Sequence, residues 1–300
     1  MTTASIKTPN CILQNPVFLL LAAGTLFGFN FPLGKIAGDA GIPPLVWAMT
    51  LSVGVSTVLL PTLIAQKQLT FPKGRMVRYV ILSAIISFIV PNILLFSVIP
   101  HAGAGYTGLM FALSPVFTLA LATFFRFKAP NKLGIIGIVI GLVGAVIVSI
   151  SRSTSPEAPE IFWLFAALSI PMVLAAGNIY RSLDWPENAE ADALAFWGHS
   201  FALPIFGVLL LTTENYTALG ALSEAPFAVL AQMLVAGIMF PIYFRLQKEG
   251  GPVLLSQIGY VAAAVGLLIA TMVLGENYGA ITWAGAAIIA AGIAVTIKAQ

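Results

Sequence analysis

The stretches NKLGIIGIVIGLVGAVIV (131–148) and GAITWAGAAIIAAGIAVT (279–296) decide the fold, because one is a variant of the other. A shift of 148 residues superimposes two pairs of glycines, Gly137 with Gly285 and Gly144 with Gly292. Similar shifts superimpose residues elsewhere in the chain: Trp47 with Trp197, Pro91 with Pro241, and Asn30 with Asn178. The matches keep their order along the chain, so they predict a duplicated unit.

The composition around these stretches is that of an integral membrane protein. Of the 300 residues, 59% are hydrophobic and only 8% are charged, with a mean hydropathy of +0.98, whereas a soluble domain carries about 25% charged residues. Apolar runs of roughly 18–22 residues recur, the length that crosses the hydrocarbon core as a helix. The alternating ten-residue segments of a membrane barrel are absent from the sequence. We therefore predict an all-α integral membrane protein.

The apolar runs predict ten transmembrane helices. They cover approximately residues 17–38, 43–65, 77–99, 103–124, 132–151, 161–182, 192–213, 224–246, 251–273 and 280–297. The predicted organisation is a cytoplasmic N-terminal segment (1–16), a first five-helix repeat (17–151) and a second five-helix repeat (161–297). The connections between the runs are too short for a separate domain.

The distribution of lysine and arginine predicts the orientation. With a cytoplasmic N-terminus, twelve of these residues, Arg181 among them, fall at the cytoplasmic side and only Arg152 at the other. This positive-inside bias predicts that both termini are cytoplasmic. The net charge of +3 is thereby explained as topogenic, and no basic patch of the kind that binds nucleic acid is present. The single cysteine, Cys11, precedes the first run and allows no internal disulfide.

An odd number of helices per repeat means that the second copy enters the membrane inverted. The loops agree: RFKAPNK (126–132) is basic, whereas its counterpart GENYG (275–279) carries only Glu276. Inverted repeats are typical of secondary transporters, whose two halves allow opening to either side of the membrane. The alternative is an ancient duplication without a transport function.

Three further motifs resemble one transporter family. GFNFPLGK (28–35) fits the pattern G-x-N-F-x-x-x-K of the first helix in EamA-type members of the drug/metabolite transporter superfamily. ALSPVFTLALATFF (112–125) is similar to that family's fourth helix, and LGENYGAITWAGAAIIAAGIAV (274–295) to its ending. The resemblance covers essentially the whole chain and implies a ten-helix inverted carrier that works by alternating access. Among the branches of the family, the chain is most similar overall to amino-acid exporters of the YddG type.

The chain departs from the family pattern in two places. WAMTLS (47–52) lacks an arginine that the second helix often carries, and FRFK (125–128) replaces the first copy of L-G-E. All eleven acidic residues fall in loops or at the ends of the runs, whereas ion-coupled carriers commonly hold a carboxylate at membrane depth. We therefore predict facilitated diffusion, although backbone carbonyls can also bind a coupling ion.

Two ionisable residues within the runs have alternative interpretations. Lys35 is the one lysine or arginine that we place inside an apolar run. It lies near the outer end of the first run, residues 17–38. It either meets an anionic group of the substrate or anchors the helix end at the interface by snorkelling. His199 is either a proton relay or is hydrogen-bonded to a neighbouring helix.

Neutral polar and aromatic residues at membrane depth are the candidate substrate ligands. Polar side chains in such helices either join helices or face a cavity, and the family resemblance favours a cavity for runs 1, 3, 4, 6, 8 and 9. The candidates, with Lys35, are Asn30, Phe88, Asn92, Tyr106, Met110, Ser114, Trp163, Asn178, Tyr243, Gln257 and Tyr260. Such a lining suits zwitterions or partly apolar solutes. Candidate hinges are the prolines within the runs: Pro32, Pro91, Pro115, Pro171 and Pro241.

The sequence therefore predicts a non-enzymatic exporter of small metabolites, most of all amino acids, in the bacterial inner membrane. Its partners are a small-molecule substrate and the lipid bilayer, in a monomer or a homodimer. We expect no cofactor, no metal and no nucleic acid, because phosphate-binding glycine loops and His/Cys clusters are absent from the sequence. The alternatives are a multidrug or organic-cation exporter, another metabolite exporter, an intramembrane enzyme and a channel.

Overall fold

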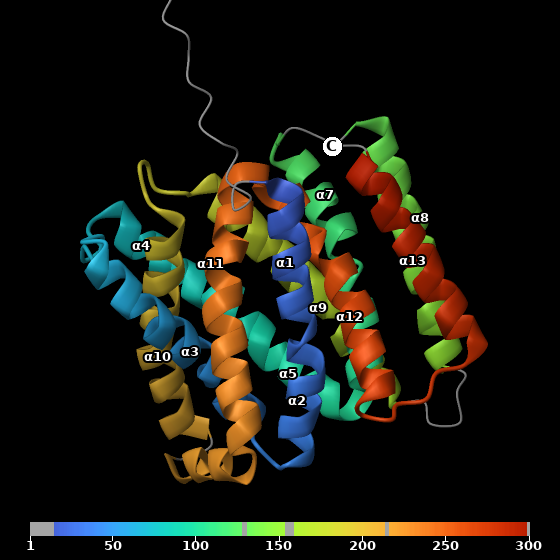
Figure 1. The fold of residues 1–300 in the computed structure, drawn as a ribbon, viewed down its shortest axis with the longest axis horizontal. Coiled ribbons are helices and arrows are strands. Elements are labelled where there is room, and N and C mark those ends of the chain that lie inside the picture. Colours follow the sequence, from blue (N-terminus) through green and yellow to red (C-terminus); the bar gives the residue numbers. More distant parts are fainter. Residues whose placement is uncertain (1–14, 128–130, 154–158, 214–215, 299–300) are drawn as a thin grey trace, which may run out of the picture.

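A computed structural model describes residues 15–127, 131–153, 159–213 and 216–298. The regular elements of these residues are all helical, and no strand occurs among them. The helices stand side by side as one bundle (Figure 1). Most of the predicted N-terminal segment, residues 1–14, lies outside the described residues, as does the side chain of Arg152.

The first half of the chain is divided into many short elements. They are α1 (Pro16–Gly28), α2 (Asn30–Asp39), α3 (Pro44–Ala65), α4 (Arg75–Ser83), the π-helix η2 (Ala84–Ile89), α5 (Val90–Ala102), α6 (Ala104–Phe111), α7 (Ser114–Phe124) and α8 (Lys132–Ser153). Consecutive elements join into longer apolar segments, for example α1 with α2 and α6 with α7. The breaks between α1 and α2, between η2 and α5, and between α6 and α7 each lie within three residues of a proline, which lacks a backbone donor. These prolines are Pro32, Pro91 and Pro115.

The second half has longer, continuous helices. They are α9 (Ile161–Leu183), α10 (Ala191–Thr213), the 3₁₀-helix η3 (Tyr216–Glu224), α11 (Pro226–Ser256), α12 (Ile258–Met272) and α13 (Ala280–Lys298). Helix α9 continues through Pro171 and α11 through Pro241. The chain bends within α11 at Gly251, whose φ of 69° is in the region that favours glycine. The predicted run 251–273 therefore starts at this bend and not in a separate loop.

The apolar helices establish a multi-pass membrane protein. Seven helical segments of the described residues are long and apolar enough to span a membrane, and three shorter apolar helices accompany them. Helices α8 and α13, which contain nearly all of the two similar stretches 131–148 and 279–296, form a pair at one edge of the bundle (Figure 1). Their glycines bring the two backbones together: a methyl group on Gly144 would lie 2.6 Å from the carbonyl oxygen of Gly285.

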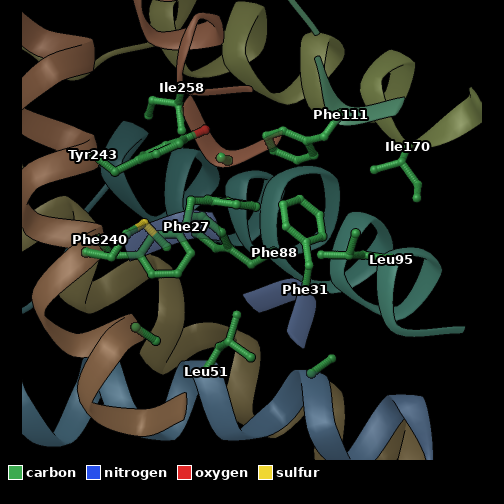
Figure 2. Close-up of a cluster of buried hydrophobic side chains, with 14 of the residues drawn as sticks. Phe27, Phe31, Leu51, Phe88, Leu95, Phe111, Ile170, Phe240, Tyr243 and Ile258 are labelled. Carbon is green, nitrogen blue, oxygen red and sulfur yellow. The ribbon is translucent and has the colours of Figure 1, made fainter. Parts of the chain in front are cut away.

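The centre of the bundle is filled largely by aromatic side chains (Figure 2). The ring centroids of Phe27 and Phe111 lie 4.6 Å apart, and those of Phe88 and Phe240 lie 5.5 Å apart. These rings come from α1, α6, η2 and α11, so they connect the first half of the chain to the second. The ring of Tyr243 packs at the border of this cluster, and its hydroxyl forms hydrogen bonds with polar side chains.

Candidate substrate site

Among the described residues, the buried lysine or arginine is Arg181 and not Lys35. Sequence reasoning placed Arg181 at the cytoplasmic end of a run, but its side chain turns inward and the residue is only 1% exposed. Its Nε donates a hydrogen bond to Gln247 Oε1 (2.8 Å), and its Nη2 donates to Asn178 Oδ1 (2.7 Å) and to the Tyr243 hydroxyl (2.6 Å). The guanidinium therefore lies in a neutral polar shell inside the protein.

Helix periodicity explains how two helices build this shell. Asn178 and Arg181 are three residues apart on α9, and Tyr243 and Gln247 are four apart on α11, so each pair shares one face. The Tyr243 hydroxyl donates to Asn178 Oδ1 (2.7 Å), while Gln247 Nε2 donates to the Asn178 carbonyl (2.9 Å). Asn178 is thus the common acceptor that orients the other three side chains.

Aromatic faces complete the surroundings of the guanidinium. Arg181 Cζ lies 5.1 Å from the ring centroid of Tyr243, 5.6 Å from that of Phe244 and 5.8 Å from that of Phe88. Rings at this range attract a cation through their quadrupole. They also exclude water, which strengthens the attraction between the guanidinium and any anion that reaches it.

No carboxylate of the described residues forms an ion pair with Arg181. The ion pairs found among them join other cations to Asp39, Asp184, Asp192 and Glu190. A buried charge without a counter-ion is costly, because neutral hydrogen bonds replace only part of its hydration. An anionic ligand would offset this cost, so the site is suited to bind a carboxylate.

A second buried polar group, His199, borders the same aromatic wall. His199 is fully buried on α10, and its Nδ1 lies 3.0 Å from Ser52 Oγ on α3. The imidazole stacks on Phe88 with 4.0 Å between the centroids and meets Phe240 edge-on at 4.1 Å. The hydrogen bond to a neighbouring helix, one of the two interpretations of His199, is present.

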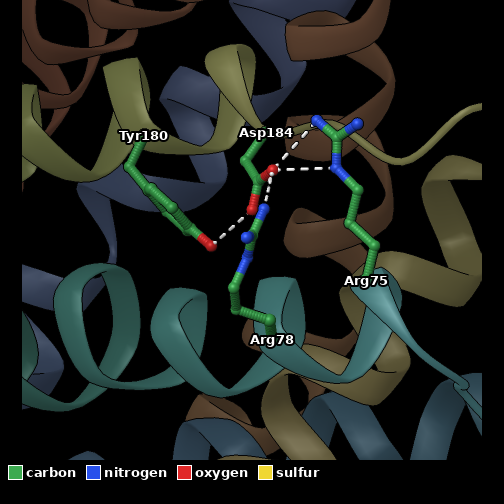
Figure 3. A network of polar contacts seen from close by, with 4 residues as sticks. All are labelled: Arg75, Arg78, Tyr180 and Asp184. Carbon is green, nitrogen blue, oxygen red and sulfur yellow. Dashed lines mark hydrogen bonds and ion pairs between the residues drawn. The ribbon is translucent and has the colours of Figure 1, made fainter.

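Beside the Arg181 site, four residues tie α4 to the end of α9 (Figure 3). Asp184 Oδ1 accepts hydrogen bonds from Arg75 Nε (2.9 Å) and Arg78 Nη2 (2.7 Å), and its Oδ2 accepts one from the Tyr180 hydroxyl (2.9 Å). Burial favours the neutral acid and raises the pKa of Asp184, but the bonds from Arg78, Tyr180 and Arg75 outweigh it. The pKa of Asp184 is therefore held below its usual value.

A cavity of about 600 Å³ adjoins this cluster. Its walls include charged residues of both signs from the α3–α4 and α9–α10 connections: Lys73, Arg75, Glu187 and Glu190. Arg75 lines the cavity and also binds Asp184, so the cavity and the tie between α4 and α9 share one side chain.

A different tie joins the α12–α13 connection to the start of α6. The Glu276 carboxylate accepts hydrogen bonds from the backbone N–H groups of Ala104 (2.8 Å) and Gly105 (3.0 Å). The Tyr278 hydroxyl donates to the same carboxylate and accepts from the N–H of Tyr106 (3.1 Å). A carboxylate is favoured there because the first N–H groups of a helix lack partners within it.

The structure brings together three of the twelve residues that were predicted as ligands. Phe88, Asn178 and Tyr243 surround Arg181. Asn30 instead accepts a hydrogen bond from Gln232 Nε2 on α11 (2.6 Å). Lys35 pairs with Asp39 one helical turn away (2.5 Å), and its side chain is 24% exposed.

The other predicted ligands are distributed through the bundle. Asn92 donates to the Phe88 carbonyl (2.7 Å), and Trp163 stacks on His101 with 3.8 Å between the centroids. Tyr260 is buried against Gly141 of α8. The rest are buried in α6, at the start of α7 and before α12: Tyr106, Met110, Ser114 and Gln257.

Sequence reasoning missed Arg181, Gln247 and the partner of His199, Ser52. One signal for Arg181 was available: the spacing Asn178-x-x-Arg181 places the cation on the same helix face as a candidate ligand. Gln247 lies beyond the predicted end of its run at residue 246, because α11 continues to Ser256. The direction in which these side chains turn depends on the packing of α9 against α11.

Comparisons with known proteins agree with this architecture. Residues 14–150 match the model of the EamA-like transporter family. The Uncharacterized inner membrane transporter YedA of Escherichia coli K12 is 24% identical over 273 residues, which cover 89% of this chain and 86% of YedA. The YedA proteins of E. coli O6:H1 and O157:H7 match to the same extent.

A solved structure supports the fold independently. A protein determined by crystallography superimposes with a TM-score of 0.70 over 94% of this chain and 98% of its own, at 18% identity. An identity this low shows a shared fold only. The match of residues 14–150, the YedA relatives and the bundle of apolar helices together support a membrane transporter that is similar to the EamA-like transporter family.

Proposed function

We propose that this transporter exports small metabolites that carry a carboxylate, amino acids foremost, by facilitated diffusion. In this proposal the apolar segments form ten transmembrane helices in two inverted five-helix repeats. Both termini lie in the cytoplasm, and the protein works in the inner membrane as a monomer or a homodimer. The family and the inner-membrane location of the YedA relatives support this assignment.

The observation that carries the proposal is the isolated guanidinium of Arg181. It is buried between the two long helices α9 and α11, it is bound by neutral partners, and aromatic rings border it. A substrate carboxylate would supply the missing counter-charge by accepting from the N–H groups of Nη1, because Nε and Nη2 already donate to Gln247, Asn178 and Tyr243. The aromatic wall would accept the apolar part of the same substrate.

Alternating access would break and re-form two sets of hydrogen bonds described above, one around Asp184 and one around Glu276. The Asp184 cluster joins α4 of the first repeat to α9 of the second, and Glu276 joins the second repeat to α6 of the first. In this mechanism the substrate enters from the cytoplasm through the charged cavity beside Arg75. The tie around Asp184 opens for entry, and the tie around Glu276 opens for release to the outside.

An organic-cation exporter is the rival within transport. A cationic substrate requires an acidic or π-rich site without a competing charge, and Arg181 would repel it. The Arg181 site therefore favours anionic or zwitterionic solutes over organic cations.

The first test is efflux from proteoliposomes loaded with a panel of labelled amino acids, with and without a pH gradient. We expect saturable efflux that does not depend on the gradient. Arg181→Gln should abolish it, whereas the matched control Lys35→Gln removes a partly exposed cation that is paired with Asp39 and should leave it unchanged. Efflux that follows the proton gradient would contradict facilitated diffusion, and equal efflux from Arg181→Gln and wild type would contradict the assigned site.

A further inference from the structure

His199 has a ring nitrogen that no residue satisfies. Its Nδ1 is paired with Ser52, but Nε2 is completely buried and has no hydrogen-bond partner among the described residues. Burial removes the hydrogen bond that this nitrogen would make with water, and no hydrogen bond within the protein replaces it, which costs free energy. The arrangement is explained if a ligand provides the partner when the site is occupied.

His199 and Arg181 both lie close to the ring of Phe88. The imidazole centroid lies 4.0 Å from the Phe88 centroid, and Arg181 Cζ lies 5.8 Å from the same centroid. Arg181 Cζ and the imidazole centroid are therefore at most about 10 Å apart. A zwitterion that makes two hydrogen bonds of about 2.9 Å spans roughly 8–9 Å, which is within this limit. Phe88 itself belongs to the π-helix η2, a kind of turn that often occurs at functional sites.

The chemistry of the two groups is complementary. Arg181 only donates hydrogen bonds and carries a positive charge, so it selects a carboxylate. A neutral imidazole whose Nδ1–H donates to Ser52 keeps a lone pair on Nε2, which accepts a hydrogen bond. The buried acidic side chains of the described residues, Asp184 and Asp192, already form ion pairs with arginines.

We propose that His199 is a specificity-determining residue that accepts a hydrogen bond from the ammonium group of the substrate through Nε2, while Arg181 binds its carboxylate. The proposal rests on the proposed function and narrows its substrate class to α-amino acids. In this proposal Ser52 accepts from the Nδ1–H and so acts as a positioning residue that holds the ring with its lone pair on Nε2. The rings of Phe88 and Phe240 then lie beside the substrate and favour an apolar side chain.

The test compares three ligands that differ by one charged group each. The probe is the amino acid with the fastest efflux in the panel, together with its deaminated and decarboxylated analogues. For leucine these are 4-methylpentanoate and 3-methylbutylamine. Calorimetry on the purified full-length protein in detergent gives each Kd and avoids the passive permeation of the analogues through vesicles.

We expect wild type to bind leucine at least about tenfold more tightly than 4-methylpentanoate, the size of one hydrogen bond to a charged group. His199→Phe should remove this preference while its affinity for 4-methylpentanoate stays within about twofold. Ser52→Ala should reduce the preference in part, and His199→Gln, which restores an acceptor, should recover some of it. Arg181→Gln should weaken the binding of both ligands that carry a carboxylate, leucine and 4-methylpentanoate.

The outcomes separate the two proposals. If wild type binds no carboxylate, the proposed function fails and this inference fails with it. If wild type binds 4-methylpentanoate as tightly as leucine, the carboxylate site stands and the role of His199 is refuted. A His199→Phe protein that weakens both ligands equally would indicate a structural role, which also refutes it.

Discussion

Asn30 and Asn178 superimpose when the chain is shifted by 148 residues, yet their side chains make different contacts in the structure. Both lie on helices that pack against α11, and both accept a hydrogen bond from a side chain of that helix. Each is followed by a cation within five residues, Lys35 and Arg181 respectively. Lys35 points away toward Asp39, whereas Arg181 turns inward and binds Asn178 itself.

The difference teaches that two positions that match in sequence need not have the same role in the structure. Asn30 and Gln232 form a neutral contact that joins α2 to α11, whereas Asn178 belongs to a polar centre that surrounds a positive charge. The first half also has its helices interrupted near prolines, while α9 continues through Pro171. The first half thus provides the neutral contact at Asn30, and the second half provides the buried charged group.

The largest expected effect comes from removing the inward cation. Arg181→Gln should reduce amino-acid efflux by about 100-fold or more, because a desolvated charge pair with the substrate is lost. The same change should leave the substrate-free protein as stable or about 1 kcal/mol more stable, because a buried charge without a counter-ion disappears. Efflux and thermal unfolding in detergent, measured on the same preparation, check both parts. A parallel loss of stability would show that the charge has a structural role.

The next effect separates the two asparagines. Asn178→Ala should raise KM for efflux about tenfold, because Arg181 and Tyr243 lose their shared acceptor. Asn30→Ala should instead lower the unfolding free energy by about 1 kcal/mol and change KM by less than about twofold, because it removes only a contact between helices. Kinetics and unfolding curves for both variants provide the comparison. Equal KM changes would mean that the two sites are functionally equivalent.

A smaller effect is expected at the tie between α4 and α9. Asp184→Asn should lower the unfolding free energy by about 1 kcal/mol, since Arg75 and Arg78 are partly exposed. The folded-state pKa of Asp184 lies below its ordinary value, so its stabilising contribution is fully present above about pH 4 and is lost as the pH falls through the lowered pKa. Thermal unfolding of both proteins at pH 7 and near pH 3 should show a difference that shrinks in acid. A constant difference would exclude the carboxylate as its origin.

The smallest effect is expected at the outward cation. Lys35→Gln removes a pair with Asp39 one turn away, a kind of contact worth about 0.3–0.5 kcal/mol on a helix surface. Efflux should change by less than about twofold for every amino acid in the panel. A selective loss for acidic or zwitterionic solutes would instead assign Lys35 to the substrate path.

Much of this organisation could be predicted from the sequence, because apolar length is a strong signal. The helical segments follow from runs that only a membrane accommodates, and Phe88, Asn178 and Tyr243 follow from their depth in those runs. Arg181 could not be assigned in the same way. A cation two residues from a helix end reaches either the interface or the interior, and only the packing of α9 on α11 decides between them. The π-helix before Pro91 and the pairing of His199 with Ser52, far apart in sequence, depend on tertiary contacts in the same way.

The paired glycines of α8 and α13 have a consequence for how this protein can evolve. The carbonyl of Gly285 leaves no space for a methyl group on Gly144, and that of Gly137 leaves none on Gly292, where a methyl would lie 2.7 Å away. Neither helix can therefore acquire a larger residue at these points unless its partner changes as well. Substitutions at these glycines are therefore coupled between the two helices, so a larger residue on one of them requires a compensating change on the other.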